Sequence, residues 1–94
     1  MTTIVVDLED KPGVLNRVTS LCWRRAFNIE WLSFNRTALP RVARMTMVID
    51  TDERGAQRLE DNLYKIINVI HVNVTTWGAA KDESVVDYAE AANA

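Results

Sequence analysis

The order in which hydrophobic patterns follow one another is the feature that most restricts the fold of this chain. Residues 3–8 are rich in β-branched side chains, which favours a strand. Residues 14–27 carry apolar side chains at three- and four-residue steps, which is the pattern of one helix face. The later runs repeat these patterns, with strands expected at 29–36, 42–50 and 70–76 and a helix at 53–67. The predicted order is therefore strand, helix, strand, strand, helix, strand.

This order predicts an α+β domain of the ferredoxin-like βαββαβ type, in which an antiparallel sheet carries two helices on one face. The chain has 94 residues, the size of one domain. We expect the domain to span residues 1–77, followed by an acidic, Ala-rich tail or short helix over residues 78–94. The second face of the sheet would carry Val5, Val48 and one set of side chains from residues 29–36. Pairing with a second copy, by sheet edge or by face, is the natural remedy for such an exposed surface, so we expect a homodimer.

The periodicities also predict which side chains face the core. The first helix places Cys22 on its apolar stripe, which favours packing over a reactive thiol, and Asn28 is a common type of helix terminator. On the second helix the expected core face is Ala56, Leu59, Leu63, Ile66 and Ile67. In the last strand the inward residues are expected to be Ile70, Val72 and Val74.

The strand at residues 29–36 alternates imperfectly. Ile29 and Trp31 would share one face, while Leu32 and Phe34 would share the other. Either both faces of this strand are covered, or a bulge shifts its register.

The turn between the first strand and the first helix is a candidate binding site. Pro12 suits the start of a helix because its missing N–H has no helical partner there. Gly13 has no side chain, so a ligand can approach the backbone. The free N–H groups of a helix start attract a carboxylate or a phosphate. The alternative is a strand-to-helix turn with no further role.

Composition narrows the classes of function. The net charge is −2, and residues 1–80 hold ten basic and nine acidic side chains, which gives no electrostatic case for nucleic acid. The chain has neither a signal-peptide core nor an apolar run long enough to span a membrane, so we expect a cytoplasmic protein. The single His71 should point away from the core, without a second metal ligand at a useful spacing. No catalytic carboxylate pair, Ser-His-Asp set or Cys-His set has local support.

Four segments resemble a known family. Residues 10–15, Asp-Lys-Pro-Gly-Val-Leu, are similar to the turn that marks ACT domains in general. Residues 25–30, Arg-Ala-Phe-Asn-Ile-Glu, together with 44–47 and 59–72, more closely resemble the small regulatory subunits of acetolactate synthase (acetohydroxyacid synthase), in a short single-domain form.

The resemblance implies a subunit without catalytic activity. Such subunits bind and activate the catalytic large subunit, which holds thiamine diphosphate, Mg and FAD, and they confer feedback inhibition by a branched-chain amino acid, typically valine. The effector would lie between two ACT domains of a dimer. The positions that match its site are Asp10, Gly13, Val14, Leu15, Asn28 and Ile29. Family members often have Asn at the position of Asp10, whose carboxylate here would either hold the ammonium group of the effector or repel its acid end.

Three tryptophans are candidate contacts with a partner chain. Trp23 lies off the apolar stripe of its helix, Trp31 lies in the irregular strand, and Trp77 follows the last strand. Aromatic residues are enriched at the centres of interfaces, although packing within the domain would account for them equally well. The alternative function is a free-standing ACT sensor that regulates another enzyme or a transporter of amino-acid metabolism.

Overall fold

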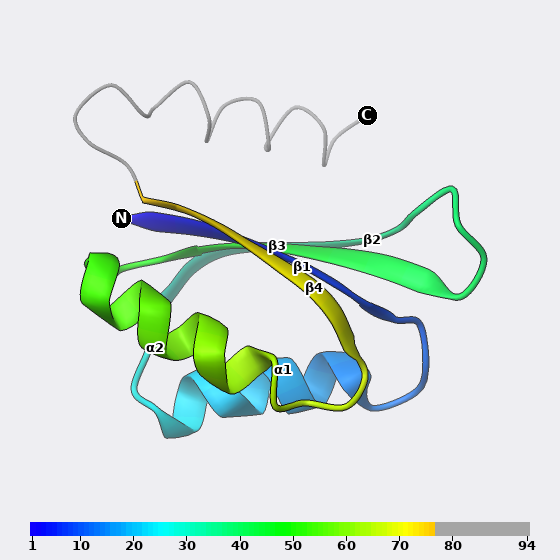
Figure 1. The fold of residues 1–94 in the computed structure, drawn as a ribbon, viewed down its shortest axis with the longest axis horizontal. Coiled ribbons are helices and arrows are strands. Elements are labelled where there is room, and N and C mark those ends of the chain that lie inside the picture. The colour runs from blue at the N-terminus through cyan, green and yellow to red at the C-terminus, as the bar shows by residue number, and fades with distance from the viewer. Residues whose placement is uncertain (77–94) are drawn as a thin grey trace.

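The predicted order of elements is confirmed in a computed structural model, which describes residues 1–76 (Figure 1). Its six elements are β1 (Thr2–Glu9), α1 (Val14–Arg24), β2 (Ile29–Arg36), β3 (Val42–Ile49), α2 (Glu53–Leu63) and β4 (Val69–Thr76). The predictions for Trp77 and for the tail at 78–94 lie outside the described residues.

The four strands form one antiparallel sheet in the order β2-β3-β1-β4. Figure 1 shows α1 and α2 side by side on one face of this sheet, as the ferredoxin-like prediction requires. β1 and β3 are the central strands, so β2 and β4 are the two edges. Val5 and Val48 lie on the second face of the sheet, because their neighbours along each strand belong to the core cluster and side chains alternate between faces. Trp31 pairs directly with Val48 and therefore lies on the same face.

The hydrophobic core fills the space between the sheet and the two helices. Fully buried side chains come from every layer, including Ile4 and Leu8 of β1, Val18 of α1 and Leu59 of α2. Cys22 is also fully buried, as its place on the apolar stripe predicted. Burial disfavours the charged thiolate and raises the pKa of the Cys22 thiol to about 11.

A bulge in β2 explains its imperfect alternation. Ile29 pairs with Ile49, whereas Trp31 pairs with Val48, so one extra residue lies between the two pairs. The insertion turns Ile29 toward the helices and Trp31 toward the second face, and the two residues therefore do not share a face as predicted. Leu32 pairs with the buried Met47 and returns to the helix side.

A second register shift corrects the prediction for β4. Asp7 pairs with His71 but Leu8 pairs with Val69, which leaves Ile70 outside the ladder with 51% of its surface exposed. Val69 packs against the core instead. Val72 and Val74 do face inward, as predicted.

Both helices end earlier than the sequence predicts. α1 ends at Arg24, and the residue in the left-handed conformation is Ala26 (φ 60°), not Asn28. Ala26 N–H donates to Trp23 O at 3.1 Å and Phe27 N–H donates to Cys22 O at 2.9 Å, which is the Schellman pattern of helix termination.

The end of α2 removes Ile67 from the core. α2 ends at Leu63, and the chain then follows a tighter path in which Ile66 N–H donates to Leu63 O at 3.0 Å. Ile66 still packs against the core, but Ile67 is 86% exposed, so its predicted place on the core face is wrong.

Leu63 is buried and Ile67 is exposed, so truncating each side chain to Ala should lower the free energy of unfolding by different amounts. Leu63→Ala should lower the free energy of unfolding by about 2–5 kcal/mol, because the side chain is fully buried and its removal leaves a cavity. Ile67→Ala should change it by less than about 0.5 kcal/mol, because little of that side chain is packed. Urea denaturation of both variants measures the difference, and equal losses would contradict the exposed position of Ile67.

Candidate functional site

The turn between β1 and α1 leaves backbone donors free. Gly13 has φ 86° and forms the N-cap of α1 without a side-chain hydrogen bond. Val14 N–H donates to Lys11 O at 3.3 Å, but the N–H groups of Gly13 and Leu15 have no partner within residues 1–76. A Cβ at Gly13 would meet no atom within 4 Å, so the space above the turn is open. The arrangement suits a carboxylate that accepts hydrogen bonds from this helix start.

Asp10 joins the turn to the end of β2. Its carboxylate lies 3.1 Å from the Arg36 guanidinium, and its N–H donates to Arg41 O at 2.8 Å. Arg36 therefore balances the negative charge that Asp10 brings to the turn. The neighbouring Glu9 carboxylate lies 3.0 Å from the Lys11 amine, and the hydrogen bond and charge of Lys11 lower the pKa of Glu9.

A polar network that the sequence did not predict holds the other side of the turn. Arg17 Nη1 donates to Asn68 Oδ1 at 2.6 Å, and Asn68 Nδ2 donates to Glu9 Oε1 at 3.4 Å. Glu9 N–H also donates to Asn68 O at 2.9 Å. The network links β1, α1 and the loop before β4, and no local motif indicates it because Arg17 and Asn68 are 51 positions apart.

The predicted effector site has two halves: the turn around Gly13, and Asn28 with Ile29. The second half lies at the opposite end of α1. Asn28 is exposed, its side-chain amide donates to the Glu30 carboxylate, and its carbonyl accepts from Asp50 N–H at 3.0 Å. Ile29 is half-buried against the core. The 11 residues of α1 separate Gly13 from Asn28, a length of about 16 Å at 1.5 Å per residue. Within one chain, the fold therefore does not bring the two halves together.

The apolar members of the site lie beside these polar groups. Val14 is buried in the core, and Leu15 is half-buried at the start of α1. Of the predicted partner contacts, Trp23 is 84% exposed on α1 and Trp31 is half-buried on the second face of the sheet.

Other kinds of site receive little support from the described part of the chain. Within residues 1–76, no group of three or more His, Cys, Asp or Glu side chains is placed to hold a metal ion. His71 is exposed, with its Nδ1 3.5 Å from Tyr64 Oη. None of the helices in this part of the structure has the length and hydropathy needed to cross a membrane.

The βαββαβ sandwich and the glycine turn after β1 are features of ACT-type domains, and comparison with known proteins assigns the chain to this class. Residues 4–71 match the AHAS small subunit-like ACT domain. The chain belongs to this family, as the resemblance of its motifs predicted.

Named relatives and a solved structure are consistent with this family. The chain is 44% identical over 70 residues to the acetolactate synthase small subunit of Mycobacterium leprae, covering 74% of this chain and 41% of that protein. It is 40% identical over 81 residues to the probable acetolactate synthase small subunit of Archaeoglobus fulgidus, covering 86% of this chain and 51% of that protein. The chain thus spans about half the length of these relatives, or less.

The crystal structure of the acetolactate synthase small subunit from Thermotoga maritima superposes with a TM-score of 0.74 at 26% identity. The alignment covers 78% of this chain and 45% of that one.

The conformation of Gly13 predicts a graded response to substitution. Gly13→Ala should lower the free energy of unfolding by about 1–2 kcal/mol, because a side chain is strained at φ 86° although it meets no other atom. Gly13→Asn should lower it less, because Asn tolerates the left-handed region. Urea denaturation of both variants measures the order, and equal stability of wild type and Gly13→Ala would rule out the strain.

Proposed function

We propose that this chain is a non-catalytic regulatory subunit of acetolactate synthase, which binds and activates the catalytic large subunit and makes it sensitive to a branched-chain amino acid, valine. Family membership supports the regulatory class. Thiamine diphosphate, Mg and FAD would be held by the catalytic subunit, and the effector would bind between two copies of this chain.

The separation of the two half-sites along α1 is the observation that supports a paired site most directly. β2 is an edge strand, and Asp10 ties the Gly13 turn to Arg36 at the end of that strand. Antiparallel pairing of two β2 strands would place the start of one beside the end of the other. Asn28 and Ile29 of one copy would then approach the turn of the second copy.

The other edge of the sheet is less available for such pairing. Val72 N–H donates to Tyr64 Oη at 2.9 Å, and Tyr64 Oη donates to Val72 O at 3.2 Å. Tyr64 thus occupies both outward backbone groups of Val72 in the middle of β4. A protected edge of this kind resists the addition of another strand, which favours pairing along β2.

The chemistry of the two half-sites fits an aliphatic amino acid. The free N–H groups of Gly13 and Leu15 would donate to its carboxylate. Asn28 offers a carbonyl acceptor and an amide donor, and Leu15 and Ile29 offer apolar surface for the side chain. Arg36 balances the charge of Asp10, so Asp10 need not repel the acid end of the effector and remains an acceptor for its ammonium group.

Titration calorimetry with valine tests the sensing half of the proposal. The wild type should bind valine saturably, with one site per chain or per dimer, and Gly13→Asp should lose binding because its carboxylate would stand where the ligand carboxylate binds. Gly13→Asn is the matched control, since Asn has nearly the shape of Asp and also tolerates φ 86°, but carries no charge. Normal binding of valine by Gly13→Asp would show that the site lies elsewhere.

Proline substitution in β2 tests the pairing. The N–H groups of successive residues in a strand point alternately toward its two sides. Thr37 N–H donates to Val42 O and so points toward β3. Leu32 lies five residues earlier, an odd number, so its N–H points to the free edge. Leu32→Pro should therefore spare the ladder with β3 but prevent pairing with a second copy, giving a monomer that no longer binds valine.

Sedimentation velocity and calorimetry on Leu32→Pro and on the control Leu32→Ala give the readout, with circular dichroism to check folding. Leu32→Ala should remain dimeric. A folded Leu32→Pro variant that stays dimeric and binds valine would contradict the pairing along β2.

A further inference from the structure

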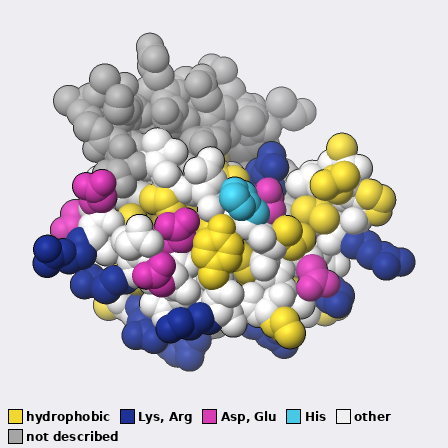
Figure 2. All heavy atoms as spheres, in the orientation of Figure 1, with side chains coloured by type: hydrophobic (Ala, Val, Ile, Leu, Met, Phe, Trp, Pro, Cys, Tyr) yellow, Lys and Arg dark blue, Asp and Glu magenta, His cyan; other side chains and the backbone are white. Residues whose placement is uncertain are grey.

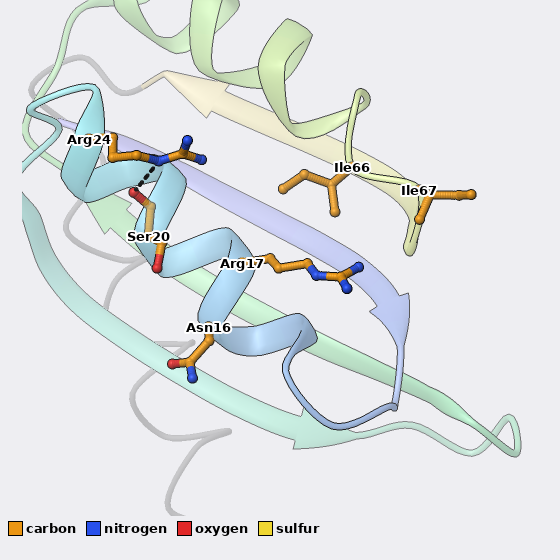
Figure 3. Close-up of a pocket in the computed structure, with 6 residues that line it drawn as sticks. All are labelled: Asn16, Arg17, Ser20, Arg24, Ile66 and Ile67. Atoms are coloured by element: carbon orange, nitrogen blue, oxygen red, sulfur yellow. Dashed lines mark hydrogen bonds between the residues drawn. The ribbon is translucent and has the colours of Figure 1, made fainter.

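A groove on the helix layer contains none of the residues assigned to the effector site. It has a volume of about 360 Å³ and runs between α1 and the loop that joins α2 to β4. Figure 3 shows Arg17 and Arg24 extending from α1 on the side that faces Ile66 and Ile67 of the loop. The residues that line it are Asn16, Arg17, Ser20, Arg24, Ile66 and Ile67, and we refer to it as the α1 groove.

The α1 groove carries positive charge that no carboxylate balances within residues 1–76. Arg17 donates to the neutral amide of Asn68, and Arg24 donates to Ser20 O at 3.4 Å. Neither forms an ion pair with an acidic side chain of the described residues, and α1 itself contains no Asp or Glu. In Figure 2, Lys and Arg side chains gather along the lower edge of the molecule, over the two helices.

Exposed apolar side chains flank these arginines. Ile67 and Trp23 are 86% and 84% exposed, the highest values among the large hydrophobic side chains of the described residues. Ile67 forms one wall of the groove. Trp23 lies three residues after Ser20 and seven after Asn16, so it continues their ridge on α1, opposite the core. Apolar groups beside unpaired cations are typical of a surface that binds another protein.

We propose that the α1 groove is the docking site for a segment of the catalytic subunit that presents carboxylate side chains next to an apolar side chain. The carboxylates would pair with Arg17 and Arg24. Apolar side chains of the segment would contact Ile67 in the groove and Trp23, which lies next to Arg24 on α1. Charge complementarity identifies the occupant as acidic. This inference rests on the proposed regulatory function, and it adds the surface and the chemistry of the partner.

The position of the groove is compatible with a dimer along β2. Antiparallel pairing of two edge strands in a continuous sheet has its twofold axis perpendicular to the sheet, which keeps both helix layers on one face. Two α1 grooves would therefore open on the same side of the dimer. None of the effector residues lines the groove, and Arg17 links the groove to the network that holds the turn.

Charge reversal at Arg24 tests the inference. Arg24→Glu should weaken binding of the purified catalytic subunit by about tenfold or more in biolayer interferometry, and Trp23→Ala and Ile67→Ser should each weaken it by several fold. Arg54→Glu is the matched control, since Arg54 is exposed in the first turn of α2 and does not line the groove. All variants should remain folded and keep the valine affinity of the wild type, and Arg24→Glu should be slightly less stable because it places a negative charge in the last turn of α1.

Site-specific crosslinking supplies a second readout. Cys22 is fully buried, so a photoreactive maleimide on Ile67→Cys labels one position selectively. The label should capture the catalytic subunit at a peptide that contains Asp or Glu, whereas the same label on Arg54→Cys should not.

The outcomes distinguish a failure of the docking site from a failure of the proposed regulatory function. Wild-type affinity in Arg24→Glu, Trp23→Ala and Ile67→Ser would overturn the docking site while leaving the regulatory function intact. Absence of binding by the wild type itself would overturn both. Saturable binding of an RNA oligonucleotide that Arg24→Glu abolishes would assign the groove to nucleic acid and would also overturn the proposal.

Discussion

The pairing of β1 with both β3 and β4 is the constraint on which the rest of the domain depends. β1 lies inside the sheet, and its residues Ile4, Val6 and Leu8 are completely buried beneath the helices. Its last residue leads directly into the turn before α1. The strand therefore determines where the open backbone of Gly13 stands relative to the core, and the polar network at Glu9 holds the turn there.

Register shifts in the two edge strands decide which side chains join the core. One extra residue in β2 turns Trp31 to the second face, and the shift in β4 excludes Ile70 while admitting Val69. Side chains alternate along a strand, so inserting one residue changes the face of every residue that follows. These shifts occur only on edge strands, where one side of the backbone is not held by a neighbouring strand of the same chain.

The three proposed activities use separate parts of the surface. Pairing of two copies would use the free edge of β2, while the opposite edge is partly closed by the hydrogen bonds of Tyr64. The proposed effector site would use the two ends of α1, which a second copy would bring together. Docking of the catalytic subunit would use the outer side of α1 and the loop after α2, whose residues line the α1 groove.

The sequence by itself determined the order of elements, the glycine turn, the burial of Cys22 and the exposure of Trp23. These features follow from hydrophobic periodicity and from backbone preferences, which act over a few residues. The tertiary structure decided where α1 and α2 end, which residues the edge strands bury, and how Asp10 and Arg17 are paired. Arg36 and Asn68 reach these two side chains only after distant segments pack together, and no local pattern encodes a contact between residues so far apart in the chain.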